Sequence, residues 1–391
     1  MFVQLICKDR DDDQKNEIYQ VLGALCEREG VQIEDRGDKV EILVCPQGKI
    51  AVTEEGKEVI LSANTRHGGP GFHAFVVDLF EALEEEIPGE YELDDDLEFS
   101  KDNDFDRIVH AYENELDYVR KLILNNPEFR KRNYLFDETY YLPKADEHKV
   151  LTSTGDMDED EFRNKSIADL MDRFYVWNDW DRDGRFYRNA ALTLLAKESF
   201  GPYSKMNEQT ENVANEICDD LEIAFRLDPT LPLPLKAYRE LTRQLDREDK
   251  LKGAVEMDSE AVQYRTREVY HLFEDARVVA PGTAERSYDP ALQSVFLMAP
   301  YEDNQEWSWL IQASKQPAIL PDLDQVMDQT PEKTSDGDVC WMKAFEEDGI
   351  YTIDAVIGDG ERKLYIHALA RSKEEQDYLR QCILLSGFFA G

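Results

Sequence analysis

The spacing of apolar residues changes twice along this 391-residue chain, and this change limits the folds that the chain can adopt. Short apolar runs typical of β-strands fill the first part and return after about residue 256, whereas residues 158–249 repeat apolar side chains at helical spacing. Such blocks indicate a multi-domain α+β protein. We predict an N-terminal α+β domain at 1–145, a helical domain at 146–255 and a C-terminal α+β domain at 256–391.

The N-terminal part is predicted to be an α/β-type domain with antiparallel strands. Its first apolar run is followed by a segment that places Ile18, Leu22 and Leu25 on one helix face. Turn pairs containing Gly37, Gly48 and Gly56 separate the next strands. The predicted elements are a strand at 2–7, a helix at 14–28, strands within 31–45 and 49–61, and helices at 71–86 and 105–124.

The middle part is predicted to be helical and the C-terminal part to be an antiparallel sheet with helices on one face. Gly201-Pro202 and a cluster of three prolines provide stops between the helices. Ser372 and Glu375 form a capping box, which predicts a last helix through Leu385. The middle helices are predicted at 159–176, 185–199, 206–226 and 234–246. The C-terminal strands are predicted at 269–280, 294–299, 307–313, 339–345, 351–357 and 363–370.

The chain is strongly acidic, with 84 Asp and Glu against 45 Lys and Arg and a formal net charge of -39. This field repels nucleic acid and anionic lipid, so neither is an expected partner. It attracts a basic protein, a cationic ligand or a divalent metal. The acids are partly concentrated in two stretches, at about 78–98 and 302–348. Solubility alone is the alternative explanation of the charge.

The chain shows no sign of secretion or of membrane insertion. Its first residues lack a basic segment and a cleavage site, and no apolar run reaches the roughly 18 residues of a membrane helix. Its six cysteines are scattered without a C-x-x-C pair, which is typical of free thiols in a reducing compartment. We expect a cytoplasmic protein without a cofactor.

The segment 62–73 runs from a strand through three glycines into an apolar helix. Backbone amides at such a helix start favour an anion, and the candidate ligand-binding residues are Arg66, His67, Gly68, Gly69, Gly71 and His73. Arg66 is the only Lys or Arg between Glu58 and Ser100. The spacing is that of neither a P-loop nor a dinucleotide fingerprint, and the glycines also suit a purely structural reversal. A histidine acting as general base would use the hydroxyl of Ser62 or Thr65.

Asp179, Asp181 and Asp183 match the first half of a calcium-binding loop. The second half fails, because the position that needs a bidentate Glu is Ala190. Arginines at positions 182, 185 and 188 also oppose a divalent cation. We therefore interpret this segment as an acidic turn between helices and predict no metal site.

Four tryptophans are candidates for contact with a protein partner. Trp177 and Trp180 lie in an aromatic stretch, while Trp307 and Trp309 alternate on a predicted strand preceded by Glu302, Asp303 and Glu306. Rigid aromatic side chains are frequent in interface hot spots, but they also fill ordinary cores. The one basic run with an aromatic neighbour, at 130–134, is interpreted as a solvated loop rather than a nucleic-acid site.

These observations predict a binding or adaptor protein for a basic protein partner. In its acidic composition the chain resembles bacterial immunity proteins that block toxic nucleases. That resemblance implies an inhibitor- or immunity-type role, although no motif carries it. The alternative is an enzyme or small-ligand sensor that binds an anionic group at the Gly-rich turn 62–73.

Overall fold

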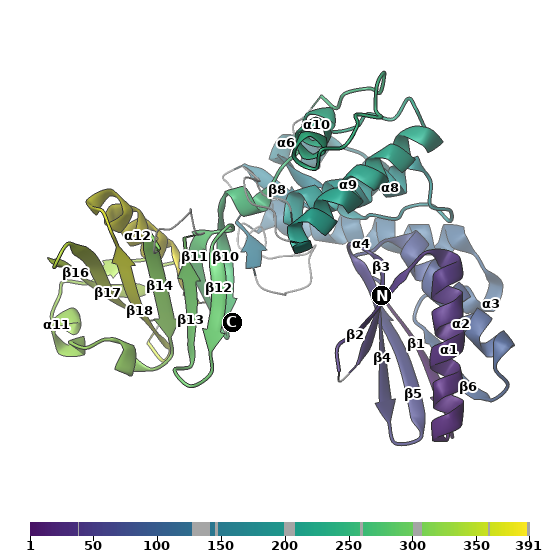
Figure 1. Ribbon diagram of the computed structural model, residues 1–391, viewed down its shortest axis with the longest axis horizontal. Helices are drawn as coiled ribbons and strands as arrows, with labels where there is room; N and C mark the ends of the chain where they lie inside the picture. Colours follow the sequence, from purple (N-terminus) through teal and green to yellow (C-terminus); the bar gives the residue numbers. More distant parts are fainter. Residues whose placement is uncertain are drawn as a thin grey trace. The chain divides into compact units, whose positions relative to one another are not determined.

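The computed structural model describes residues 1–391 apart from 38, 127–140, 145–147, 199–207, 259–260, 300–306, 359 and 389–391. Contacts divide the chain into two compact units. The first consists of 1–137 with 145–263, and the second of 138–144 with 264–391. Both units contain helices and antiparallel sheets, so the predicted multi-domain α+β class is confirmed (Figure 1). The division into three domains stays a prediction.

A six-stranded antiparallel sheet opens the first unit, in the order β2-β3-β4-β5-β1-β6. Alternate residues of β1 and β5 are buried, and Leu5 and Leu61 pair in register within the core. This period of two gives the sheet one apolar face. The strands are β1 (Phe2–Lys8), β2 (Gln32–Asp35), β3 (Val40–Cys45), β4 (Gly48–Glu55), β5 (Glu58–Asn64) and β6 (Glu90–Asp95).

Two helices of the first unit carry broad buried faces next to this sheet. Helix α1 (Asp12–Glu29) begins with a capping box of Asp11 and Gln14, and it ends where Gly30 adopts a φ of 65°. Helix α2 (Pro70–Glu86) contacts α1, β1, α3 (Phe99–Asp102) and α4 (Phe105–Asn125). Because neighbours lie on several sides, α2 is apolar around much of its circumference.

The rest of the first unit is mainly helical and has its own buried cluster, which α8, α9 and α10 form together. The helix predicted at 159–176 is wrong as one element, since Lys165 is extended and Ser166 caps a second helix. The elements are β8 (Lys149–Thr152), β9 (Gly155–Asp158), α6 (Glu159–Asn164), α7 (Ile167–Phe174), α8 (Gly184–Lys197), α9 (Glu208–Leu227) and α10 (Leu235–Gln244).

Two antiparallel sheets form the second unit. The larger has the order β12-β13-β14-β18-β17-β16-β15 and the smaller the order β19-β11-β10-β7. The strand predicted at 269–280 is in fact a hairpin, which turns at Glu274 with a φ of 53°. The strands are β7 (Tyr141–Pro143), β10 (Glu268–Phe273), β11 (Ala276–Pro281), β12 (Glu285–Asp289), β13 (Ser294–Met298), β14 (Trp309–Ser314), β15 (Glu332–Lys333), β16 (Val339–Glu347), β17 (Ile350–Gly358), β18 (Lys363–Ala370) and β19 (Gly387–Phe388).

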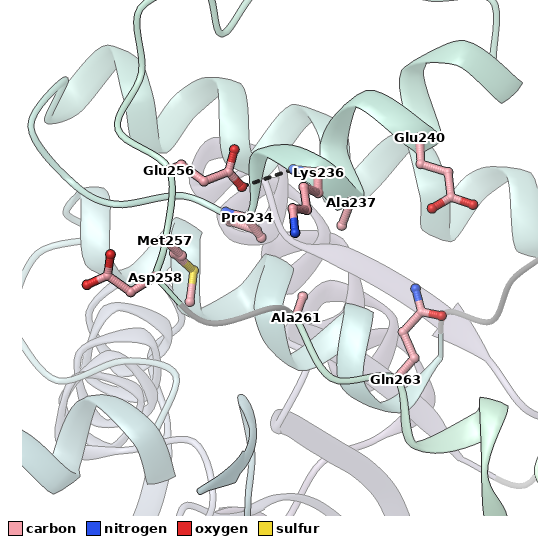
Figure 2. Close-up of a pocket in the computed structure, with 9 residues that line it drawn as sticks. All are labelled: Pro234, Lys236, Ala237, Glu240, Glu256, Met257, Asp258, Ala261 and Gln263. Carbon is pink, nitrogen blue, oxygen red and sulfur yellow. Dashed lines mark hydrogen bonds between the residues drawn. The ribbon is translucent and has the colours of Figure 1, made fainter.

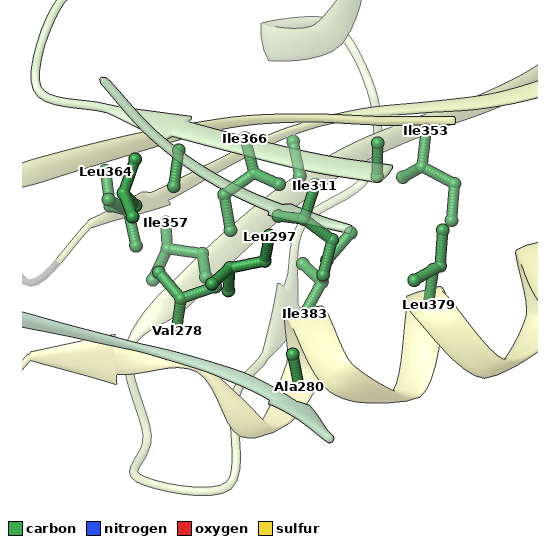
Figure 3. Packing of buried hydrophobic residues seen from close by; sticks show 14 of the residues in the cluster. Val278, Ala280, Leu297, Ile311, Ile353, Ile357, Leu364, Ile366, Leu379 and Ile383 are labelled. Carbon is green, nitrogen blue, oxygen red and sulfur yellow. The ribbon is translucent and has the colours of Figure 1, made fainter. Parts of the chain in front are cut away.

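The core of the second unit lies on one face of the larger sheet (Figure 3). Val278 and Ala280 of β11 and Leu379 and Ile383 of helix α12 (Lys373–Leu385) pack against aliphatic side chains of the larger sheet. Helix α12 starts at the predicted capping box of Ser372. On the opposite face, α11 (Leu323–Met327) and two sheet strands share a smaller apolar cluster.

Candidate functional site

The structure joins two segments that the sequence presented as separate candidate sites. The Gly71 amide donates to the Trp177 carbonyl at 3.0 Å, and the Trp177 amide donates to the Gly68 carbonyl at 3.0 Å. We call residues 65–71 together with 175–183 the turn–loop junction. The Gly-rich turn thus lies against the aromatic stretch and the Asp-rich turn.

The glycines of the junction are required by close packing. A Cβ atom on Gly71 would lie 2.1 Å from the Trp177 ring, and one on Gly69 would lie 2.4 Å from the Trp177 carbonyl oxygen. Gly69 also has a φ of 107°, which disfavours any side chain. The Gly71 amide, which an anion at the helix start would need, is already bonded to protein. The structural explanation therefore accounts for these glycines without a ligand.

The basic residues of the turn have protein neighbours as well. The Arg66 guanidinium, 45% exposed, forms an ion pair with Glu115 of α4. His67 is half-buried and makes its own contacts. His73 is fully buried, as expected for a core histidine between Phe72 and Phe75.

A buried hydrogen-bonded chain links the turn to β6. Thr65 Oγ1 lies 2.9 Å from His73 Nδ1, and His73 Nε2 lies 2.9 Å from Asp95 Oδ1. Burial raises the pKa of Asp95, but bonds from His73 and the Ser100 and Leu97 amides outweigh it and lower the pKa to about 2. With Asp95 ionised, His73 Nε2–H donates to it, and Thr65 O–H donates to Nδ1.

Hydroxyl, imidazole and carboxylate follow one another as in a catalytic triad, in which they are the nucleophile, the general base and the group that orients the base. Here, however, the three side chains are sealed from solvent. Thr65 and His73 are 0% exposed, so a substrate cannot reach either side chain. The Thr65 carbonyl also accepts from Tyr112 O–H at 2.7 Å, and the Thr65 amide donates to Met1. We assign the network a structural role, which is to hold the turn on β6 and α4.

Two of the tryptophans are packed inside the protein, and one is well exposed. Trp177 is 3% exposed between Phe75 and Phe186, with the Arg182 guanidinium 4.9 Å from its ring. Trp180 is 41% exposed and contacts Phe99 and Phe105.

The C-terminal tryptophans do not share a strand face. Trp309 is 7% exposed and begins β14, whereas Trp307 lies outside the strand, where the Arg371 guanidinium contacts its ring at 5.2 Å. The predicted alternation of the pair on one strand is therefore wrong. The acids at 302, 303 and 306 and the basic run at 130–132 lie outside the described residues.

The Asp-rich turn uses its polar groups locally. Asp183 caps α8 by accepting from the Phe186 amide at 2.9 Å, and Asp179 accepts from the Trp180 amide at 2.8 Å. Among the described residues, the ligand atoms of Asp179, Asp181 and Asp183 do not converge; only His73, Asp95 and Asp96 could hold a metal ion by spacing. His73 and Asp95 already bond to each other, and we assign no metal to them.

The thiols offer no reactive nucleophile. All six cysteines are free, and all except Cys45 are buried. Burial raises the pKa of Cys7 to about 11, despite the neighbouring Arg10, and the pKa of Cys340 to about 12.

A row of acids lies on α2 in the first unit, and we call it the α2 carboxylate cluster. Within the described chain none of these acids forms an ion pair. Partial burial, with Glu81 and Glu29 nearby, raises the pKa of Asp78 to about 6. The cluster lies towards the negative end of the helix dipole, which disfavours it further. Its members are Asp78, Glu81, Glu84, Glu85 and Glu86.

A second group of acids lies on α9. Burial raises the pKa of Asp220 to about 8, with Glu216 and Asp219 adding to the shift. No cation within the described residues pairs with Asp220 or Glu216, although Asp219 pairs with Arg247 at 2.6 Å. Like charges are therefore held together on two helices of the first unit.

A pocket of about 240 Å³ lies beside α10, and Figure 2 shows the side chains that line it. Its position is fixed because the Leu233 amide donates to Val255 and the Met257 amide donates to Leu233. Glu256 accepts from the Lys236 amide at 3.2 Å. Apolar and acidic residues dominate the lining, which consists of Pro234, Lys236, Ala237, Glu240, Glu256, Met257, Asp258, Ala261 and Gln263.

Comparison with known proteins gives no relative. No family model, curated protein or solved structure matches the chain. Of the helices that the described residues form, none is both long enough and apolar enough to cross a bilayer.

Proposed function

We propose that this chain is a cytoplasmic binding protein of the inhibitor or immunity type, which binds a basic protein partner. The α2 carboxylate cluster is the observation that carries the proposal. A bacterial source and a role in defence belong to the same proposal and follow from the acidic composition, not from any motif.

The cluster is costly to the isolated protein, and this cost favours a role in binding. Asp78, Glu81 and Glu84 follow one another at helical spacing, so their charges repel along one side of α2. Among the residues that the structure describes, no salt bridge compensates them, and the helix dipole does not compensate them either. A cationic partner would supply the missing charge, and the overall negative field would accelerate its approach.

The pocket beside α10 supports the same class of partner. Its volume of about 240 Å³ is below the usual range for small-molecule sites but suits a single side chain. Apolar groups of Pro234, Ala237 and Met257 can contact an alkyl stem, while carboxylates of Glu240 and Asp258 can receive a charged head (Figure 2). A lysine or arginine of the partner has this combination.

The experiment compares two variants with the same change in charge. Partners are captured from extracts of the native cell, identified by mass spectrometry, purified and titrated against the protein. Asp78→Asn/Glu81→Gln/Glu84→Gln is expected to weaken binding at least tenfold and to flatten its salt dependence. The control, Glu285→Gln/Glu347→Gln/Glu374→Gln, neutralises three exposed acids outside the cluster and is expected to change affinity less than threefold.

Three results would contradict the proposal. The captured partner could be acidic, its binding could be insensitive to ionic strength, or both triple variants could lose the same affinity. We do not propose catalysis or anion sensing at the turn 62–73, because the Gly71 amide, Arg66 and His73 all bond to protein groups.

A further inference from the structure

Two arginines flank a single carboxylate where α7 ends and α8 begins, and a third arginine lies nearby. Arg185 Nη1 and Arg188 Nη2 each lie 3.7 Å from the same oxygen of Asp172. Arg173, next to Asp172 on α7, is close enough to act on the charge of Arg188. In so acidic a chain, this is a local excess of cations.

The guanidinium donors of this group are largely unused. Each arginine carries five N–H donors, and 3.7 Å is too long for a hydrogen bond to Asp172. Arg188 donates twice to Asn189 Oδ1, at 3.1 and 2.9 Å, and Arg173 donates to the Asp156 carbonyl at 3.3 Å. The buried Nε of Arg173 has no partner. The hydrogen-bond acceptors in use are neutral, so among the described residues Asp172 is the one carboxylate that pairs with Arg185 and Arg188.

The group is held in place by surrounding bonds. Arg185 and Arg188 are three residues apart in the first turns of α8, so both point to one side of the helix. Asn189, which holds Arg188, donates to the Tyr175 carbonyl at 3.4 Å. The start of α8 adds positive potential at the same place. Arg188 is only 16% exposed, while Arg185 is 63% exposed and leaves the site open to solvent.

Other carboxylates nearby are engaged elsewhere. Asp183 caps α8 through the Phe186 amide, and Asp228 accepts from the hydroxyl and the amide of Thr230. Burial lowers the pKa of Arg188, which shows a cation that its surroundings do not fully stabilise; Arg185 and Arg173 add to this effect. A bound anion would stabilise the charged form of Arg188.

We propose that Arg185 and Arg188 form a binding site for a phosphate group, with Asp172 as the internal anion that competes with the ligand and with the charge of Arg173 adding to the local positive potential. The two forked guanidiniums of Arg185 and Arg188 and the helix start match the several acceptor oxygens of a tetrahedral oxyanion. The site is separate from the Gly-rich turn and independent of the proposed basic partner.

The test uses the full chain and calorimetric titration with inorganic phosphate at low ionic strength, followed by phosphoserine to distinguish a free ion from an organic phosphate. Arg185→Gln is expected to weaken phosphate binding about tenfold, because it removes charged hydrogen-bond donors from the site. The Arg185 side chain is exposed, so its loss leaves the fold intact. Asp172→Asn is expected to tighten binding several-fold, since it removes the competing charge. The control Arg66→Gln, at the Gly-rich turn, is expected to leave the affinity unchanged.

Arg185→Gln and Asp172→Asn are expected to change phosphate affinity in opposite directions, and this distinguishes the proposed site from a general effect of charge. Binding of inorganic phosphate that Arg185→Gln weakens and Asp172→Asn strengthens supports the proposal. Tighter binding of phosphoserine than of inorganic phosphate would indicate an organic phosphate as the natural ligand. An absence of heat at millimolar phosphate, equal loss in Arg66→Gln, or weaker binding by Asp172→Asn would overturn it.

Discussion

The buried network of Thr65, His73 and Asp95 depends on one carboxylate. Asp95 has a folded-state pKa of about 2 against an ordinary 3.8, so it stabilises the fold above pH 4. That contribution is lost as pH falls from about 4 to about 2. We expect Asp95→Asn to lower the free energy of unfolding by about 2 kcal/mol at pH 7 and by much less near pH 2.

Urea denaturation at several pH values measures this difference. The control is Asp94→Asn, which changes the exposed neighbour on the same strand and is expected to have little effect. A pH-independent loss of stability in Asp95→Asn would show that packing, not charge, explains the role of Asp95.

Gly71 permits a second prediction at the residue scale. In Gly71→Ala the new methyl group would overlap the Trp177 ring, so we expect a loss of about 2 kcal/mol. The matched control is Gly23→Ala in the middle of α1, where nothing lies within 4 Å of the added Cβ. That control should gain up to about 1 kcal/mol, because alanine favours a helix. Thermal or urea unfolding measures whether the two variants change the free energy of unfolding in opposite directions. Equal changes would refute the packing argument.

Helices and strands whose apolar residues recur at a regular spacing could be predicted from the sequence, whereas their ends and the elements they pack against could not. The helices at α1, α2 and α4 were predicted within a few residues, because each has a clear apolar face. Strand β6 was missed, since four acids in six residues hide the alternation of Tyr91 and Leu93. The hairpin of β10 and β11 was predicted as one strand, because its turn residues Glu274 and Asp275 include no glycine, which is the usual signal of a two-residue hairpin turn.

The candidate site was also predictable only in its local segments and not in the contacts between them. The sequence drew attention to the Gly-rich turn and to the Trp177 segment, but the contact between them joins residues more than a hundred positions apart. No periodicity predicts such a pairing. Asp172, which the arginines share, was also missed, since one acid among 84 carries no signal of its own.

Helix α9 carries a prediction at the element scale. Asp220 has a folded-state pKa of about 8, above its ordinary 3.8, so the folded state binds this proton more tightly and loses stability as pH rises from about 4 to 8. Asp220→Asn is expected to raise the free energy of unfolding by about 1 kcal/mol at pH 9, allowing for solvent screening, and to have no effect at pH 4.

Denaturation at pH 4, 7 and 9 tests this expectation. Glu211→Gln, on an exposed turn of the same helix, removes one charge without relieving the buried carboxyl. If both variants gain the same stability at pH 9, the general charge of the protein explains the effect and Asp220 has no special environment.

At the scale of the whole molecule, the net charge of -39 implies a trade between stability and binding. Burial, with the repulsion of neighbouring acids added to it, raises the pKa of Asp78, Glu81 and Glu84, so the wild-type protein should become more stable as pH falls from 7 to 5. Asp78→Asn/Glu81→Gln/Glu84→Gln is expected to unfold at a higher temperature at pH 7, with a gain of about 1 kcal/mol after screening is considered. The gain should shrink in about 0.5 M salt and at pH 5.

The same variant must lose affinity for its basic partner if the cluster is retained for binding, because the charges that destabilise the free protein are those that the partner neutralises. Calorimetric melting and partner titration of one preparation measure both quantities together. Higher stability with unchanged affinity would mean that the cluster serves only to keep the protein soluble. Lower stability at pH 7 would mean that an interaction within the fold compensates these acids, and the argument for a cationic partner would then fail.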